Sequence, residues 1–269
     1  MANIRAKLQE IYSLEQLASG GSVIHRLHPN AKLLATLAYI VCVVSFGRYE
    51  LYRLAPYAFY PVLLMALAEI PSQMILKRAL VALPFVLFAG ISNLIFNRAA
   101  AMRLGGVAIS YGAVSFLAML LRTFLCVAAV LILVAVTPFH EMTGALKRLH
   151  MPDLIVNLIE MIYRYLGTLA EEVSGMYTAY ALRSPNGRGV AMKHMGSFAG
   201  QLLLRSFDRA ERVYNAMQCR GYPAFGCAAF KKRFTAADGL FLFLTAGSSV
   251  LFRLMDVQGA LGAWLEGIF

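Results

Sequence analysis

The sequence predicts an all-α, polytopic membrane protein with about five transmembrane helices and a cytoplasmic domain of long amphipathic helices. Three observations lead to this prediction. Hydrophobic residues make up 59% of the 269 positions and charged residues only 14%, whereas soluble domains carry about 25% charged residues. Five segments are apolar enough to cross a bilayer. The polar, basic stretch between the fourth and fifth of them has the periodicity of amphipathic helices.

The five apolar segments are the candidate spans, since a crossing needs about 20 residues. They lie at residues 31–46, 51–70, 79–96, 111–136 and 238–255. These spans divide the chain into three parts. Residues 1–136 hold an N-terminal arm and the first four transmembrane helices, residues 137–237 form the cytoplasmic domain, and residues 238–269 hold the last transmembrane helix and a C-terminal tail.

The basic residues set the orientation of these spans. The formal net charge is +11, and thirteen of the 25 Lys and Arg residues fall within 137–237. Lys and Arg accumulate on the cytoplasmic side of membrane proteins, so we expect the N-terminus and residues 137–237 in the cytoplasm. The same rule accounts for the positive charge without a nucleic-acid partner, and the lipid bilayer is the expected surrounding.

Two long helices are predicted in the cytoplasmic stretch. Apolar residues recur there at alternating steps of three and four, which indicates one apolar stripe per helix. The first stripe comprises Leu158, Ile162, Tyr165, Leu169, Val173, Met176 and Tyr180, and the second comprises Met195, Phe198, Leu202, Val213 and Met217. A turn rich in Pro, Asn and Gly separates the helices at 184–189. Gly221 stands where a left-handed cap would end the second helix, and Pro223 prevents its continuation.

Both helices end on the same pattern, Tyr-x-Ala-x-x-x-Arg followed by a small residue. The two copies lie 37 positions apart, as Tyr177, Ala179, Arg183 and Ser184, and as Tyr214, Ala216, Arg220 and Gly221. An Arg at a helix C-terminus is favourable by itself, because it faces unpaired carbonyls. The duplication suggests a second interpretation, in which two helix ends, each with a five-donor guanidinium group, enter matching clefts on a partner.

The charged residues before the second copy also have two interpretations. Asp208, Arg209, Glu211 and Arg212 form either a solvated face, with Asp208 and Arg212 as an i,i+4 pair, or a contact that holds the two helices at a fixed angle. Arg122 lies inside the fourth span, where a charge is costly. It is expected either to be paired or to extend to the membrane interface.

The sequence offers no metal site and no catalytic centre. The five histidines lie outside the spans without the paired spacing of ligands, and the four cysteines form no CxxC. No Walker motif, Gly-rich phosphate loop, HExxH or nucleophile elbow occurs. We therefore expect a non-enzymatic chain that binds no cofactor, and any ATP hydrolysis is expected from a partner.

Two tracts of the sequence resemble a known family of membrane proteins. The tract RSFDRAERVYNAMQCRGYP at 205–223 resembles the motif of the transmembrane T component of energy-coupling factor (ECF) ABC transporters, and HPNAKLL at 28–34 resembles the segment entering that family's first span. The family carries two Ala-Arg-Gly-like triplets at the ends of two coupling helices. Here these are Leu182-Arg183-Ser184 and Cys219-Arg220-Gly221. Both depart from Ala at the first position and the first has Ser for Gly, but the central Arg remains in both.

The resemblance implies a membrane coupling subunit in a bacterial inner membrane. Its expected partners are two ABC-type ATPase subunits, which bind ATP and Mg, a CbiM-like substrate-binding membrane (S) subunit, and a small accessory membrane subunit. The wording of 205–223 and the His28-Pro29 pair look most like the cobalt type, CbiQ. A nickel- or vitamin-type T component is the alternative, because another subunit selects the substrate.

Two other classes of function were weighed. An intramembrane enzyme would need clustered carboxylates or histidines at the membrane face, and the spans contain few such residues. A stand-alone channel or secondary carrier would need polar residues at mid-membrane or repeated halves of the span region. Neither feature stands out in the sequence.

Overall fold

The computed structural model describes residues 15, 18–47, 51–96, 100–104, 107–184, 190–222 and 234–254. The chain forms two compact units. The first, called the bundle unit here, comprises Glu15–Phe139 and Lys232–Phe269. The second, called the hairpin unit, contains His140–Lys231. Each is described by itself below.

The bundle unit consists mainly of apolar helices. In chain order these are α2 (Val23–Arg26), α3 (Pro29–Val44), α4 (Leu51–Leu54), the 3-10 helix η1 (Ala55–Ala58), α5 (Phe59–Ala68), α6 (Ser72–Ala79), the 3-10 helix η2 (Leu80–Ala82), α7 (Leu83–Phe96), α8 (Tyr111–Val136) and α12 (Ala236–Leu254). The hairpin unit has the helices α9 (Phe139–Arg148), α10 (Asp153–Arg183) and α11 (Met192–Cys219).

Five apolar stretches of the bundle unit correspond to the predicted spans. Ser72–Ile91, Gly112–Val136 and Ala236–Arg253 are long and apolar enough to cross a membrane, while Pro29–Val44 and Ala55–Ala68 are shorter. The protein is therefore a polytopic, helical membrane protein, as predicted. The proline-containing spans are not single regular helices, because η1 contains Pro56 and η2 ends two residues before Pro84.

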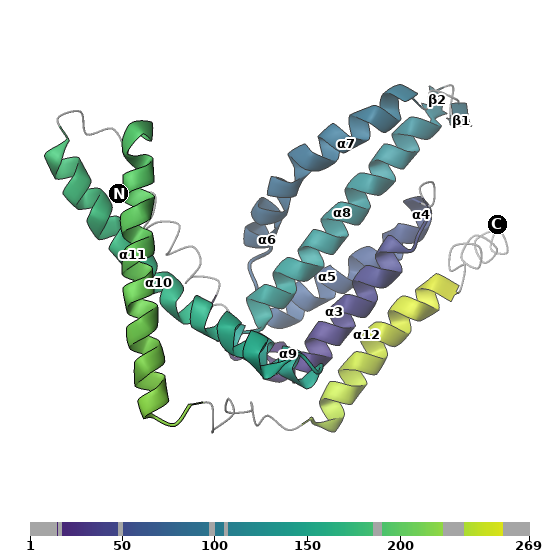
Figure 1. The fold of residues 1–269 in the computed structure, drawn as a ribbon. Helices are drawn as coiled ribbons and strands as arrows, with labels where there is room; N and C mark the ends of the chain where they lie inside the picture. The colour runs from purple at the N-terminus through teal and green to yellow at the C-terminus, as the bar shows by residue number, and fades with distance from the viewer. Residues whose placement is uncertain are drawn as a thin grey trace. The chain divides into compact units, whose positions relative to one another are not determined.

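One β-hairpin interrupts the helical architecture and was not predicted. Strands β1 (Ala100–Leu104) and β2 (Val107–Ser110) pair antiparallel, with Arg103 opposite Ala108 and Leu104 opposite Val107. A register shift lies between Ala100 and Met102. The sequence between the strands is Gly-Gly, a dipeptide that favours two-residue hairpin turns. This hairpin connects α7 to α8 (Figure 1).

The directions of three bundle helices follow from contacts at both ends of α3, which packs against α8 and α12 (Figure 1). At its start, the backbone N–H of His28 donates to Asp238 of α12, and Lys32 donates to the carbonyl of Val136, the last residue of α8. At its end, Arg253 of α12 donates to the carbonyl of Ser45. Hence α12 runs parallel to α3 and α8 runs antiparallel to it, so the chain leaves α8 and enters α12 at the same end of the bundle unit.

The side chain of Arg122 reaches the residues that follow α3. Its guanidinium donates to the carbonyls of Phe46 and Gly47, at 2.8 and 3.0 Å, just beyond the C-terminus of α3. The Arg253 guanidinium lies 4.4 Å from the centre of the Phe46 ring. Two cations thus face the carbonyl end of α3, where the helix dipole favours positive charge.

An aromatic cluster fills the core between α3, η1, α5 and α12. The rings of Tyr39 and Tyr60 stack with centroids 4.2 Å apart, and the Tyr39 hydroxyl donates to the carbonyl of Tyr57 at 2.8 Å. The Tyr57 hydroxyl donates in turn to the carbonyl of Ser249 in α12. Buried hydroxyl groups need such partners, so these bonds fix the register of the packed helices.

The closest approach of α7 and α8 depends on Gly90. A Cβ atom at this position would overlap the ring of Phe116 in α8. We predict that Gly90→Ala displaces this ring and lowers the thermal unfolding midpoint of the purified protein, because overpacking costs about 1–3 kcal/mol.

Gly247→Ala in α12 is the matched control for this substitution. Nothing lies within 4 Å of a Cβ atom there, so Ala is expected to raise or maintain the midpoint through its better helix propensity. Equal midpoints for the Gly90→Ala and Gly247→Ala variants would contradict the close approach at Gly90.

Candidate functional site

The predicted repeat lies on two antiparallel helices, α10 and α11, which make up most of the hairpin unit (Figure 1). Near the start of α10, the side chain of Asn157 donates to the Tyr222 hydroxyl just after α11, at 2.6 Å. Near the end of α10, the hydroxyl of Tyr180 lies 2.9 Å from Nδ1 of His194 in the first turn of α11. The start of each helix therefore lies beside the end of the other.

The predicted apolar stripes face each other across this pair. An apolar groove of about 640 Å³ lies between the N-terminal half of α10 and the C-terminal half of α11. Its walls include Leu158, Ile162, Tyr165 and Leu169 from the first stripe, and Val213 and Met217 from the second. Leu158 and Ile162 nevertheless remain exposed, so the two helices do not bury their stripes completely against each other.

An ion pair joins the two helices between these end contacts. Arg209 of α11 binds Glu172 of α10, and both side chains are largely withdrawn from solvent. The second carboxylate oxygen of Glu172 and Nε of Arg209 make no hydrogen bond within the described part of the chain. The Glu172 carboxylate and the Arg209 guanidinium therefore each rely on the other as ion-pair partner. Glu172 was not singled out in the sequence, because nothing local marks a Glu on one helix as the partner of an Arg 37 residues later.

Helix α9 is attached to the start of α10. The Thr143 hydroxyl donates to Glu160 at 2.7 Å, and Lys147 forms an ion pair with Asp153 at 3.0 Å. Between the helices, His150 adopts a left-handed conformation with φ of 66°, which ends α9 and reverses the chain. These contacts fix the direction in which α10 begins.

The C-terminus of α11 has the predicted left-handed cap. Gly221 has φ of 78°, its N–H donates to the Gln218 carbonyl, and the Tyr222 N–H donates to the Met217 carbonyl. This bond pair is the Schellman arrangement, and glycine adopts the required conformation without steric cost. The cap also turns Tyr222 back toward α10, where its hydroxyl accepts from Asn157.

The C-terminus of α10 ends differently, although it carries the same sequence pattern. Ser184 has φ of −95° and ψ of 123°, an extended conformation, and its N–H donates to the Tyr180 carbonyl. Ser, unlike Gly, has a Cβ atom that disfavours the left-handed region. What the two ends share is the arginine in the last turn or cap, not the cap geometry.

Both arginines are exposed, at opposite ends of the hairpin unit. Arg183 is the last residue of α10, and Arg220 is the C-cap of α11. Helix α11 has 28 residues and is therefore about 42 Å long, so the two guanidinium groups lie on the order of 40 Å apart. Of their neighbours, Leu182 is 83% exposed and Cys219 is exposed.

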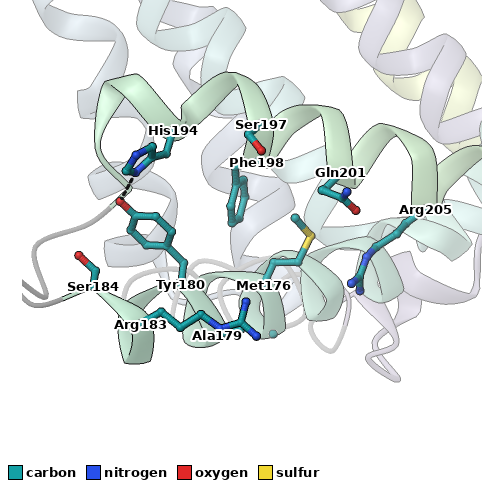
Figure 2. A pocket seen from close by; sticks show the side chains of 11 residues that line it. Met176, Ala179, Tyr180, Arg183, Ser184, His194, Ser197, Phe198, Gln201 and Arg205 are labelled. Carbon is teal, nitrogen blue, oxygen red and sulfur yellow. Dashed lines mark hydrogen bonds between the residues drawn. The ribbon is translucent and has the colours of Figure 1, made fainter.

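Arg183 lines a pocket of about 840 Å³, called the Arg183 pocket here, whose walls are partly polar and partly apolar. Figure 2 shows Arg183 and Ser184 at the end of α10, with Ser197, Gln201 and Arg205 contributed by α11. Met176 and Phe198 face each other across its apolar part (Figure 2). Arg205 was not predicted as a site residue. The pocket has two arginines, so it suits an anionic group of a ligand or partner.

The remaining residues that were predicted to support the coupling helices contribute less to the contact between α10 and α11. Ala179 lines the Arg183 pocket, Tyr177 is half-buried, and the Tyr214 hydroxyl accepts a hydrogen bond from Gln218. The other members of this set are exposed, namely Asp208, Glu211, Arg212 and Ala216. Asp208 and Arg212 form no ion pair with each other in the described structure. Of the four charged candidates, Arg209 thus makes the contact between helices.

The histidines take structural positions. His28 caps α3, its Nδ1 accepting from the Asn30 N–H, in an extended conformation as expected before Pro29. His25 contacts Ser22, and His194 contacts Tyr180. Among the described residues, no three His, Cys, Asp or Glu side chains come together in a way that could hold a metal ion.

Comparisons with known proteins agree with this architecture. Residues 20–226 match the family described as CbiQ, cobalt transport protein. The transmembrane protein EcfT of an energy-coupling factor transporter, from Ruminiclostridium cellulolyticum, is 25% identical over 89% of this chain and 94% of its own length. The nickel permease LarQ of Lactiplantibacillus plantarum is 31% identical over 32% of each chain.

A further relative is the putative fused cobalt transport protein CbiMQ of Methanocorpusculum labreanum, 27% identical over 40% of this chain and 18% of its own length. The family match covers the helices of the bundle unit from α2 to α8 and all three helices of the hairpin unit, and it ends before α12. The chain therefore belongs to the CbiQ family of cobalt transport proteins, as a transmembrane T component of the energy-coupling factor type.

Proposed function

We propose that this chain couples two cytoplasmic ABC-type ATPases to a separate substrate-binding membrane subunit, with Arg183 and Arg220 each docking into one ATPase. The observation that supports this most strongly is the placement of the two arginines. They are exposed, about 40 Å apart, and fixed at opposite ends of a pinned helical hairpin. A single arginine-bearing helix end could serve one partner, whereas two such ends that face apart suit two ATPase subunits, either two copies of one subunit or a matched pair.

The chemistry of docking follows from the guanidinium group. It presents five donors in a planar fork and binds carboxylates at two points. A cleft that buries this group must move with the helix end, because separation would leave a buried charge unpaired. ATP and Mg would be bound by the ATPases, and this chain would supply no catalytic group. At the Arg183 end, Arg205 adds a second cation for the same acidic surface.

The location of the hairpin unit on the cytoplasmic side is part of this proposal. The chain leaves α8 and enters α12 at one end of the bundle unit, so a domain between them needs to lie on only one side of the membrane. Thirteen of the 25 basic residues fall in the inserted stretch, and basic residues favour the cytoplasmic side. The membrane would be the bacterial inner membrane.

We further propose cobalt as the transported ion, carried by a CbiM-like substrate-binding subunit, with a small accessory subunit in the assembly. The family description and the fused CbiMQ relative support cobalt. Nickel is the second candidate, because one relative is named a nickel permease. Uptake of radiolabelled Co²⁺ and Ni²⁺ by cells expressing the complete transporter tests this choice, and preferential Ni²⁺ uptake would overturn it.

The first prediction concerns the two arginines. We expect Arg183→Glu and Arg220→Glu each to weaken ATPase binding at least about tenfold, because truncating or reversing one partner of a buried charge pair costs roughly 2–5 kcal/mol. The double variant is expected to lose both co-purifying ATPases and metal uptake. The Arg220 variant should be the more sensitive, because its triplet is closer to the family form. Quantitative pull-down through this chain measures the effect.

Arg164→Ala provides the control, since Arg164 is an exposed arginine of α10 away from both ends. It is expected to bind ATPases like the unmodified chain. If the Arg183/Arg220 double variant still co-purified with ATPases and supported uptake, the proposed docking would be wrong.

A second prediction concerns the cap that presents Arg220. Gly221→Ala places a Cβ atom in a left-handed conformation, which costs roughly 1–2 kcal/mol. We expect weaker ATPase binding and a lower unfolding midpoint, because the altered cap displaces both Arg220 and the Tyr222 contact. Gly200→Ala on the same helix, with open space around it, should leave binding intact. Equal binding by both variants would show that the cap does not position Arg220.

A third prediction concerns the ion pair within the hairpin. Glu172→Ala or Arg209→Ala leaves a largely buried group unsatisfied, at a cost of about 1–3 kcal/mol, and should lower the unfolding midpoint and metal uptake. Exchanging the two residues, as Glu172→Arg with Arg209→Glu, should restore part of both. Additive loss in the exchanged variant, measured as a double-mutant cycle, would rule out a direct role for the pair.

A further inference from the structure

Residues 140–231 of the hairpin unit are joined to the bundle unit by two connections, and the bundle unit holds both of them at one place. One connection follows Val136 at the end of α8, and the other precedes Ala236 at the start of α12. Residues beside each connection are bonded to the first turn of α3. All the residues that form these bonds belong to the bundle unit.

Asp238 holds the connection that enters α12. The residue is 2% exposed, and both of its carboxylate oxygens accept hydrogen bonds. One oxygen accepts from the His28 N–H at 2.6 Å, and the other accepts from the Thr235 N–H at 2.7 Å. The ring of Phe234 also packs on the His28 ring, with centroids 5.6 Å apart. A carboxylate at the starts of α3 and α12 faces the positive ends of both helix dipoles.

Lys32 holds the connection that leaves α8. The residue is 3% exposed, and its Nζ donates to the carbonyl of Val136 at 3.1 Å and to that of His25 at 3.2 Å. The ammonium group therefore faces the negative, carbonyl end of α8. It lies one helical turn from His28, so both bonded connections meet on the same turn of α3.

The choice of residues is unusual for a purely packed core. In the part of the chain that the structure describes, Lys32 and Asp238 are the only Lys, Arg, Asp or Glu residues that are buried. Buried charges are costly, and apolar residues of similar volume often stabilise a fold as well or better. Lys32 nevertheless lies at the connection that leaves α8, and Asp238 lies at the connection that enters α12.

We propose that Lys32 and Asp238 act as positioning residues that transmit movement of the coupling helices into the bundle unit. Because both connections are bonded to α3, a displacement delivered through either one moves α3 with the ends of α8 and α12. Without these bonds, the connections would flex and the displacement would be lost there. This inference rests on the proposed coupling function.

The test compares transport with ATP consumption in the complete transporter. This chain, carrying Lys32→Met or Asp238→Asn, is co-expressed with the ATPase and substrate-binding subunits of its transporter. We expect ATPases to co-purify normally and ATP hydrolysis to continue. Co²⁺ taken up per ATP hydrolysed is expected to fall by about fivefold or more, the lower end of typical coupling between sites.

Tyr57→Phe is the matched control. It also removes a buried hydrogen bond to α12, that of the Tyr57 hydroxyl to the Ser249 carbonyl, but far from the connections. Its effect should be limited to stability, with an unchanged ratio of uptake to hydrolysis. Asp238→Asn is close in shape to the original residue, so it keeps the test available if Lys32→Met does not fold.

Two outcomes would overturn the inference. If both variants kept the unmodified ratio, or lost uptake and hydrolysis in the same proportion as Tyr57→Phe, Lys32 and Asp238 would serve folding alone. If the unmodified chain did not co-purify with ATPases, the proposed coupling function would fail as well, and this result is distinct from a changed ratio in an intact complex.

Discussion

The antiparallel pairing of α10 and α11 is the constraint on which the proposed function depends. Three contacts along the pair, Asn157 with Tyr222, Glu172 with Arg209 and Tyr180 with His194, hold it at one end, between the ends and at the other end. In the proposed function these three contacts let the two helices move together as one lever, whereas two unconnected helices could move independently. The apolar stripes alone would not fix this geometry, because they remain partly exposed.

Under the proposed function, the α10–α11 pair would carry displacement between its two ends and its attachment to the bundle unit. Each end presents an arginine, and each uses a different local structure to do so. Gly221 provides a left-handed cap next to Arg220, while Arg183 precedes the extended Ser184 and lines the Arg183 pocket together with Arg205. This asymmetry suits two ATPase surfaces that differ, and on the bundle side the connections meet at a single turn of α3.

The sequence correctly predicted those features of the fold that depend on residues close together in the chain. The apolar spans, the two amphipathic helices, the extended conformation before Pro29 and the left-handed Gly221 all follow from neighbouring residues. Contacts between distant residues did not follow. Glu172 lies 37 residues from Arg209 and Asp238 lies 210 residues from His28, so no periodicity relates them. The β-hairpin was not predicted, because its strands are short and lie between two long apolar segments whose length favours helices.

The most direct test of the central claim is site-specific cross-linking with a photoreactive amino acid. Positions 182 and 219 are exposed and adjoin Arg183 and Arg220. We predict that each single substitution captures one ATPase subunit, that the double substitution yields a product with the mass of this chain plus two ATPases, and that position 164 captures none. A doubly substituted chain that never carries more than one ATPase, or captures none, would contradict the account.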